Sequence, residues 1–417
     1  MSTSPSVAVV GGGAIGLATA YELVRQGADV TVLEARQVGS GASWGNAGWI
    51  VPSLAGPVPA KGQIRYTLRS LRDPDSPVYL APRLDPDLVR WAWGFWRRCN
   101  DRDHYDGLHA TARLGAGSHD LYDRLRADGV DFEMWTDGLL FVSLQRAGAE
   151  SELEYLRVLE PYGYKLPDTV LEGDDLHAIE PFLSPDVAAG FIIGEERHVQ
   201  PASLTTGLAE AIRRLGGTVV EGAEVTAIDR VGRHVTAVRT TAGVFRPDQV
   251  LLAAGAWTTP LARHIGVNVP VLAGKGYSFS LEVDQPPARP VYLGDVKVGV
   301  TPFGHQVRFA GTMEISGINL DLDRRRVKAI VNGARRFVRH WPEQPLREVW
   351  AGMRPMAPDG LPIMGRAPGL DNTFVSTGHA MLGITLAPAS GVAMAELMLS
   401  GRTPEVLEPF GLERFGR

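Results

Sequence analysis

Cysteine is almost absent from this chain: the 417 residues contain only Cys99. A single thiol excludes an intrachain disulfide, a zinc site built from several cysteines, and an iron–sulfur cluster held by cysteines of this chain. We therefore predict no metal site, and expect a protein of the reducing cytoplasm.

A strong net charge is also missing, because 42 basic residues face 47 acidic ones and leave a formal charge of −5. This balance gives no electrostatic footprint for a nucleic acid, so no such partner is predicted. No uninterrupted apolar run approaches the roughly 18 residues of a membrane span. The first six residues lack the basic segment of a secretory signal. We therefore expect neither a membrane-spanning segment nor a secretory signal.

Glycine, by contrast, is abundant, and three of the 48 form the pattern Gly11-x-Gly13-x-x-Gly16. The pattern lies between an apolar segment, 6–10, that predicts a strand and a segment, 14–26, that predicts a helix. The first glycine allows a tight turn, the second lets backbone approach a pyrophosphate, and the third lets the helix pack closely on the strand. The helix N-terminus then faces the anion.

A second predicted strand, 28–34, ends in an acidic residue, Glu34. It lies about 20 residues beyond the glycines, where a dinucleotide-binding fold places the acceptor for a ribose hydroxyl. Glu34 is therefore the predicted ribose ligand. The motif by itself does not distinguish NAD from FAD.

The length of the chain favours two domains, one of them discontinuous. A Gly/Ser-rich loop at 37–53 is long enough to be functional. The proline-rich stretch 72–87 predicts a crossing into the second domain, followed by helices to about residue 127. Further on, 201–215 predicts a helix and 218–228 predicts strands.

Asp87 could cap the first helix of the second domain. An apolar stripe in that helix comprises Leu88, Trp91, Ala92, Phe95, Trp96 and Cys99. We expect this stripe to be buried in the core, while its tryptophans and the nearby arginines leave a membrane-surface role as the alternative.

Three later segments complete the expected fold. The strand 249–255 ends in Ala-Ala-Gly, which suits close approach of backbone to a ligand. The alternating pattern over 275–313 predicts an antiparallel sheet. The segment 321–340 predicts a helix, in which the run Arg324-Arg325-Arg326 is expected to form a solvated face.

The C-terminal part holds two glycine-rich segments, 350–365 and 376–391. The second leads into an apolar helix whose N-terminus could stabilise an anionic reduced flavin. In the first, Arg354 stands among apolar residues and prolines, where a buried guanidinium needs an anionic partner. That partner could be a substrate carboxylate; an ion pair with Asp359 or a backbone-capping role is the alternative.

Taken together, these motifs resemble the D-amino acid oxidase superfamily of FAD enzymes, and most closely its bacterial D-amino acid dehydrogenase family. The resemblance covers nearly the whole chain. The segments that match the family are 11–16, 42–48, 88–93, 198–202, 253–257, 275–278, 354–360 and 378–383.

The resemblance implies an α/β fold, α+β overall, with a Rossmann-like FAD-binding domain and a second domain of mainly antiparallel sheet plus helices. The FAD-binding domain would comprise 1–80, 195–270 and 345–417, and the substrate-binding domain 81–194 and 271–344. FAD would bind noncovalently, because Cys99 lies in a substrate-domain helix. The residues expected to bind FAD are Gly11, Gly13, Ala14, Ile15, Gly16, Glu34, Ala35, Arg36, Ala42, Ser43, Asn46, Ala47, Gly48, Val225, Ala254, Gly255, Gly378, His379, Leu382, Gly383, Ile384 and Thr385.

On the substrate side, the resemblance assigns the carboxylate to Arg354, with Tyr277 assisting and His379 near the flavin ring. His379 could equally be a satisfied loop histidine. Two departures from the family pattern affect the pocket: Val296 replaces a tyrosine common before the lysine equivalent to Lys297, and Trp49 replaces a smaller polar residue. Trp49 predicts a narrower, more apolar pocket.

The implied activity is oxidative deamination of D-amino acids, small, neutral or proline-like, by hydride transfer from Cα to flavin N5. It gives 2-oxo acids or cyclic imines, as in amino acid catabolism, and the electrons pass to a quinone, a partner protein or oxygen. A glycine/sarcosine-type or other secondary-amine oxidase and an FAD-dependent 2-hydroxy-acid dehydrogenase are the alternatives. A nonenzymatic flavin-fold protein and an NAD-only dehydrogenase fit less well. The expected location is cytoplasmic, with peripheral contact to the inner membrane face as an option; the oligomeric state is not predicted.

Gly13→Val tests the predicted phosphate cradle. The valine side chain would occupy the space that the pyrophosphate needs, so we expect purified Gly13→Val protein to lose FAD retention. The measurement is the flavin absorption band relative to protein absorbance at 280 nm. A variant as yellow as the wild type would contradict the cradle assignment.

Overall fold

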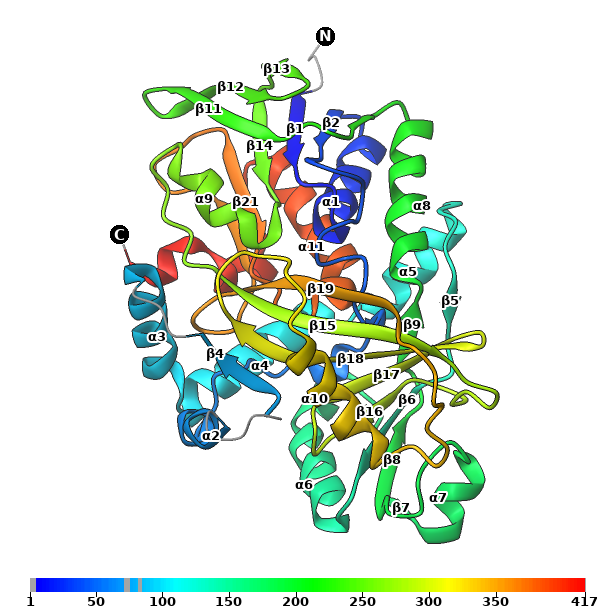
Figure 1. The fold of residues 1–417 in the computed structure, drawn as a ribbon. Coiled ribbons are helices and arrows are strands. Elements are labelled where there is room, and N and C mark those ends of the chain that lie inside the picture. The colour runs from blue at the N-terminus through cyan, green and yellow to red at the C-terminus, as the bar shows by residue number, and fades with distance from the viewer. Residues whose placement is uncertain (1–4, 71–75, 82–84, 417) are drawn as a thin grey trace.

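A computed structural model describes residues 5–70, 76–81 and 85–416 of the chain (Figure 1). A six-stranded sheet carries the glycine motif. Its central strand, β1 (Ser6–Val10), pairs in parallel with β2 and β14 because apolar residues on both faces of these strands are buried. In spatial order the strands are β10 (Thr218–Val220), β2 (Asp29–Leu33), β1, β14 (Gln249–Leu252), β21 (Thr373–Thr377) and β20 (Ile363–Arg366). Only β20 is antiparallel to its neighbour.

Three helices cover one face of this sheet: α1 (Ala14–Arg25), α8 (Pro201–Arg214) and α11 (Gly383–Ser400). Helices α1 and α11 approach closely, since a Cβ on Gly391 would meet the backbone of Ala18. The other face packs against α9 (Thr258–Arg263) and a small sheet above it in Figure 1. That sheet consists of β11 (Val225–Val231), β12 (His234–Thr240) and β13 (Gly243–Phe245).

A larger, mainly antiparallel sheet lies below the first in Figure 1. In spatial order its strands are β19 (Arg347–Met356), β15 (Leu272–Glu282), β18 (Gln306–Ile315), β17 (Val298–Phe303), β16 (Val291–Leu293), β6 (Leu139–Ser143), β8 (Ala189–Ile193) and β7 (Leu171–Glu172), with β4 (Val78–Leu80) beside β18. The antiparallel pairing expected over 275–313 is present in β15, β17 and β18. The predicted fold class is confirmed.

The remaining elements surround the larger sheet or join the two sheets. A three-stranded sheet consists of β3 (Trp49–Ile50), β9 (Arg197–Val199) and β5 (Met134–Trp135). The helices are α2 (Gln63–Ser70), α3 (Pro86–Arg98), α4 (Asp101–Gly115), α5 (Ser118–Ala127), α6 (Arg146–Leu156), α7 (Gly173–Ile179) and α10 (Arg324–Arg335). The six-stranded sheet draws its strands from three distant parts of the chain, while the exact domain boundaries stay a prediction.

The apolar stripe of α3 is not buried, contrary to expectation. None of the helix residues is buried: of the stripe, Ala92 and Trp96 are exposed, while the other members, Leu88, Trp91, Phe95 and Cys99, are half-buried. The prediction that the stripe is buried was wrong because helical spacing shows that a helix is amphipathic, but does not show which face packs against the core. The N-cap was also misplaced: Asp85, not Asp87, accepts the backbone N–H groups of Asp87 and Leu88.

The expected solvated face of α10 is only partly correct. Arg324 and Arg325 are exposed, but Arg326 is buried, with its guanidinium 4.7 Å from the ring centroid of Tyr79. Helical geometry explains the difference, because three consecutive residues point in directions about 100° apart.

Among the described helices, only α11 is long and apolar enough to span a membrane by length and composition. In this structure 72% of that segment is buried inside the protein. A buried core helix passes the same test, and α11 packs on α1.

Candidate functional site

A cavity of about 1030 Å³ joins the two large sheets. At one end it is lined by the glycine motif, the end of β2 and the loop before β3. At the other end it is lined by residues of β15, β18 and β19. The carboxyl ends of parallel strands thus open onto the floor of the larger sheet, which is where an open α/β sheet usually binds its ligand.

The glycine motif has the close packing that its residue types require. Gly11 has φ +113°, and a Cβ there would collide with the backbone of Ala253 on the neighbouring strand. A Cβ on Gly16 would collide with the Gly11 carbonyl oxygen. Gly16 therefore allows α1 to approach the turn, and it does not line the cavity itself.

The acidic residue at the end of β2 is held by backbone groups. Glu34 Oε2 accepts the Gly12 N–H at 2.8 Å, and Oε1 accepts the Arg36 N–H at 2.9 Å. These bonds fix the carboxylate at the cavity wall and leave it further acceptor capacity. This geometry suits the ribose hydroxyls for which Glu34 was predicted.

The N-terminus of α1 lines the cavity with Gly13, Ala14 and Ile15. Its N-cap, Gly13, makes no side-chain capping bond, and the Ala14 N–H donates to Ser43 Oγ at 3.0 Å. A helix end of this kind attracts an anion through its N–H groups and its dipole. The cradle therefore fits a pyrophosphate.

Most of the predicted cofactor residues line the cavity. They are Gly11, Gly13, Ala14, Ile15, Glu34, Ala35, Arg36, Ala42, Ser43, Asn46, Ala47, Gly48, Val225, Ala254, Gly255, His379, Leu382, Gly383 and Ile384. Besides Gly16, two of the predicted set do not line it. Gly378 has φ +78° and lies against Ile363, while Thr385 Oγ1 bonds the Trp49 carbonyl and the Val51 N–H, joining α11 to β3.

His379 is a buried, neutral histidine at the cavity wall. Burial lowers its pKa to about 3, so the imidazole carries no proton charge at neutral pH. Its Nε2 lies 3.0 Å from Ser390 Oγ, and within the described part of the chain its Nδ1 has no hydrogen-bond partner. An orphaned ring nitrogen beside the uncapped N-terminus of α11 can bind a polar ligand edge.

The Arg354 guanidinium lies across the floor of the cavity. Arg354 is on β19, and its side chain crosses Gly276 of β15, where a Cβ would collide with the guanidinium. Its Nη1 donates to the Thr312 carbonyl of β18 at 2.7 Å. Burial lowers the pKa of Arg354 to about 10, which leaves it protonated at neutral pH. Among the described residues no carboxylate pairs with it.

The proposed structural partner of Arg354, Asp359, is engaged elsewhere. Asp359 Oδ2 accepts from Arg414 Nε at 2.7 Å. The predicted alternative of an ion pair between Arg354 and Asp359 is therefore wrong, because Asp359 pairs with Arg414. The alternative that Arg354 binds backbone is correct for one bond only, from Nη1 to the Thr312 carbonyl. The other N–H donors of the guanidinium are left for a ligand.

Tyr277 lines the cavity, but its hydroxyl is already used. The hydroxyl donates to Glu314 Oε2 at 2.7 Å, and Glu314 Oε1 also pairs with Lys275 Nζ at 3.1 Å. Burial, reinforced by Glu314, raises the pKa of Tyr277. With its single proton given to Glu314, Tyr277 cannot also donate to a substrate carboxylate in this arrangement.

Two tryptophans narrow the substrate end of the cavity. Trp49 is held by a bond from Nε1 to Thr301 Oγ1 at 2.8 Å and meets Tyr292 edge to face at 5.8 Å. Trp350 covers Gly352, where a Cβ would collide with its ring. Lys297 lines the cavity, whereas Val296 packs against α10 and does not.

Comparison with known proteins agrees with this geometry. Residues 6–397 match the family model described as DAO, FAD dependent oxidoreductase. The chain belongs to this family. It is 34% identical over 410 residues to the D-amino acid dehydrogenase of Methylobacterium radiotolerans, covering 96% of this chain and 97% of that protein.

Solved structures show the same fold at low sequence identity. Glycine oxidase from Bacillus cereus superposes with a TM-score of 0.75 at 22% identity, covering 97% of this chain and 98% of that one. L-proline dehydrogenase from P. horikoshii has a TM-score of 0.73 at 19% identity, covering 100% and 98%. As a family member the chain is an FAD-dependent oxidoreductase, and the cradle, the Glu34 carboxylate and the two uncapped helix ends fit FAD. The described residues hold no cluster of three or more metal-ligating side chains.

Several cavity residues were not predicted. They include Gly45, Glu152, Tyr155, Trp257, Tyr292, Thr312 and Trp350. Gly276 stands in the quoted Lys275-Gly-Tyr-Ser segment, yet nothing in that segment indicates that an arginine about 80 residues later crosses it. Tertiary packing brings these residues together. Tyr292, Thr312 and Trp350 depend on strand pairing, and one sequence does not reveal the register.

Gly276→Ala tests the placement of Arg354. The added methyl must displace the guanidinium, so we expect the KM for an amino acid substrate to rise about 10- to 100-fold while FAD remains bound. Steady-state kinetics and flavin absorbance measure both effects. Gly194→Ala is the matched control, since a Cβ there meets nothing within 4 Å. Unchanged kinetics in Gly276→Ala would contradict the observed position of Arg354.

Proposed function

We propose that the protein oxidises small, neutral or proline-like D-amino acids to 2-oxo acids or cyclic imines. The observation that carries this proposal is the buried Arg354 guanidinium, which faces a ligand-sized cavity without a carboxylate partner among the described residues. A buried cation in that state is costly until an anion binds. The name of the relative from Methylobacterium radiotolerans, D-amino acid dehydrogenase, supports the carboxylate of a D-amino acid as the anionic group that binds.

In the proposed reaction Arg354 binds the substrate carboxylate, and the cavity walls orient the rest of the molecule. Arg354 retains several N–H donors after its bond to Thr312, enough for a bidentate carboxylate contact. Fixing the carboxylate fixes Cα, and this placement is the main contribution of the protein. FAD supplies the two-electron acceptor when it is bound.

Proton transfer needs no dedicated base from this chain. The substrate amine must be deprotonated before or during oxidation, and solvent can accept that proton. His379 stays neutral, but its Nε2 is paired with Ser390, so we assign it no acid–base role. Loss of two electrons and two protons gives an imine; water then converts an open-chain imine to a 2-oxo acid and ammonia, while a proline-like imine stays cyclic.

The aromatic walls support small or ring-shaped substrates. Trp49 and Trp350 occupy volume near Arg354, which disfavours a bulky cationic side chain. A glycine- or sarcosine-type amine and a 2-hydroxy acid would use the same arginine and remain the alternatives. The electron acceptor is proposed by class only, as a quinone, a partner protein or oxygen.

The direct test is an anaerobic titration of the FAD-loaded protein. Separate D- and L-amino acids, both prolines, glycine, sarcosine and a 2-hydroxy acid are added while the flavin band is recorded. We expect D-amino acids to bleach the band, with small and cyclic side chains most effective. Bleaching by L-amino acids or by the hydroxy acid alone would overturn the proposed substrate class.

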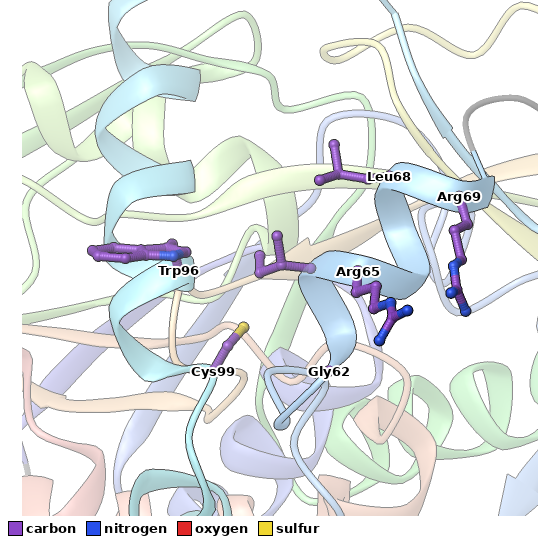
Figure 2. Close-up of a pocket in the computed structure, with 7 residues that line it drawn as sticks. Gly62, Arg65, Leu68, Arg69, Trp96 and Cys99 are labelled. Atoms are coloured by element: carbon purple, nitrogen blue, oxygen red, sulfur yellow. The ribbon is translucent and has the colours of Figure 1, made fainter.

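We also propose that the protein is cytoplasmic and contacts an anionic membrane through an α2–α3 surface. We define this surface as the exposed apolar residues Leu68, Val89, Trp93 and Trp96 with the exposed Arg65, Arg69 and Arg97. Figure 2 shows a pocket in it, lined by Arg65, Leu68 and Arg69 of α2 and by Trp96 and Cys99, with the two arginine side chains pointing away from Trp96. Tryptophans interleaved with arginines suit the headgroup region of anionic lipid.

Vesicle sedimentation tests the α2–α3 surface. The double variant Trp93→Ser/Trp96→Ser should lose binding to phosphatidylglycerol vesicles while its anaerobic flavin reduction is unchanged. Val231→Ser/Val244→Ser, which alters exposed apolar residues on β11 and β13 at the top of Figure 1, away from α2 and α3, is the control. Equal sedimentation of all three proteins, or none by the wild type, would contradict membrane contact.

A further inference from the structure

Thr312 adopts a backbone conformation that its residue type resists. Strand β18 contains a bulge where Lys275 pairs with Glu314 but Tyr277 pairs with Gly311, so Thr312 and Met313 oppose the single residue Gly276. Thr312 has φ +65° at this bulge. Glycine normally takes the left-handed position of such a bulge, and a β-branched residue there is a true outlier.

This strain belongs to a group of strained residues around the cavity. Four described non-glycine residues have positive φ, and three of them, Lys297, Thr312 and Ala380, line the cavity. Strained backbone persists only where the surrounding structure enforces it, and it gathers at functional sites. A threonine at a position where glycine would be unstrained therefore points to a use for its side chain.

Thr312 lies immediately beside Arg354. Its carbonyl accepts the Nη1 proton of Arg354 at 2.7 Å, and the residue is 6% exposed at the cavity wall. The bulge also turns the Met313 N–H toward the Pro77 carbonyl at 2.6 Å, which fixes the peptide between Thr312 and Met313. Within the described part of the chain, no group hydrogen-bonds the Thr312 hydroxyl. The Thr312 hydroxyl is therefore a donor available to a ligand in the cavity that the residue lines.

We propose that Thr312 is a second residue of the carboxylate site: its hydroxyl donates to one carboxylate oxygen while Arg354 binds the same group. This inference rests on the proposed function, because it takes Arg354 as the carboxylate ligand. It replaces the expected contribution of Tyr277, whose proton is committed to Glu314. The site thus selects a carboxylate with one cation and one neutral donor.

Thr312→Val and Thr312→Ser test the hydroxyl. Valine keeps the shape and the β-branch but has no donor, whereas serine keeps the donor. The probe is propanoate, a carboxylate without an amine, titrated into the FAD-loaded protein while the flavin spectrum is followed. We expect valine to raise the Kd about 10- to 100-fold and serine to change it by less than about threefold. An unchanged Kd in Thr312→Val would overturn the proposal.

Thr312→Gly tests the strain. Glycine adopts φ +65° freely, so the midpoint of thermal unfolding should rise by about 1–3 °C, in the apoprotein as well. Its propanoate Kd should rise as in Thr312→Val. A lower midpoint together with an unchanged Kd would show that the side chain only fills space, and would contradict the inference.

Arg354→Lys separates this inference from the proposed function. If the lysine variant binds propanoate as the wild type does, or if the wild type responds neither to propanoate nor to any amino acid, the carboxylate site itself is wrong. If Arg354→Lys binds weakly while Thr312→Val binds normally, only the role of Thr312 fails.

Discussion

The buried guanidinium of Arg354 is the constraint on which the candidate site depends. It lies over Gly276, bonds the Thr312 carbonyl and keeps its charge without a carboxylate partner among the described residues. Burying an unpaired charge costs several kcal/mol. The packed strands β15, β18 and β19 must hold the side chain there, and binding of an anionic substrate returns part of that cost.

The cavity therefore has two anion-binding ends of different kinds. At the cofactor end, uncapped helix N-termini and glycine backbone present neutral donors with a favourable dipole, which suit a pyrophosphate and a flavin edge. At the other end, the positively charged Arg354 guanidinium lies in a pocket that aromatic side chains also line. In the proposed arrangement FAD would occupy the first end and the substrate carboxylate the second.

Much of the fold could be predicted from the sequence because its signals are local. The glycine motif, the strand ending at Glu34 and the alternating pattern after residue 275 each indicate an element without reference to distant residues, and the structure has these elements. Arg354 could be singled out for the same reason, since a lone arginine among apolar residues and prolines is informative by itself.

The predictions that were wrong concern features that depend on tertiary contacts. The α3 stripe has the spacing of a core helix, yet none of its residues is fully buried: Trp96 is exposed, and Trp91 is half-buried with its Nε1 bonded to the Met356 carbonyl. Asp359 stands five residues from Arg354, yet it pairs with Arg414. The hydrogen bond from the Tyr277 hydroxyl to Glu314 depends on the register of two strands, and the strained backbone of Thr312 depends on a bulge. A single sequence shows neither feature.

A crystal structure of the FAD-loaded protein with propanoate bound tests the central claim most directly. The account predicts the propanoate carboxylate within hydrogen-bond distance of Arg354, with the guanidinium still over Gly276. Propanoate bound elsewhere in the cavity, or an Arg354 side chain turned toward a protein carboxylate, would contradict it.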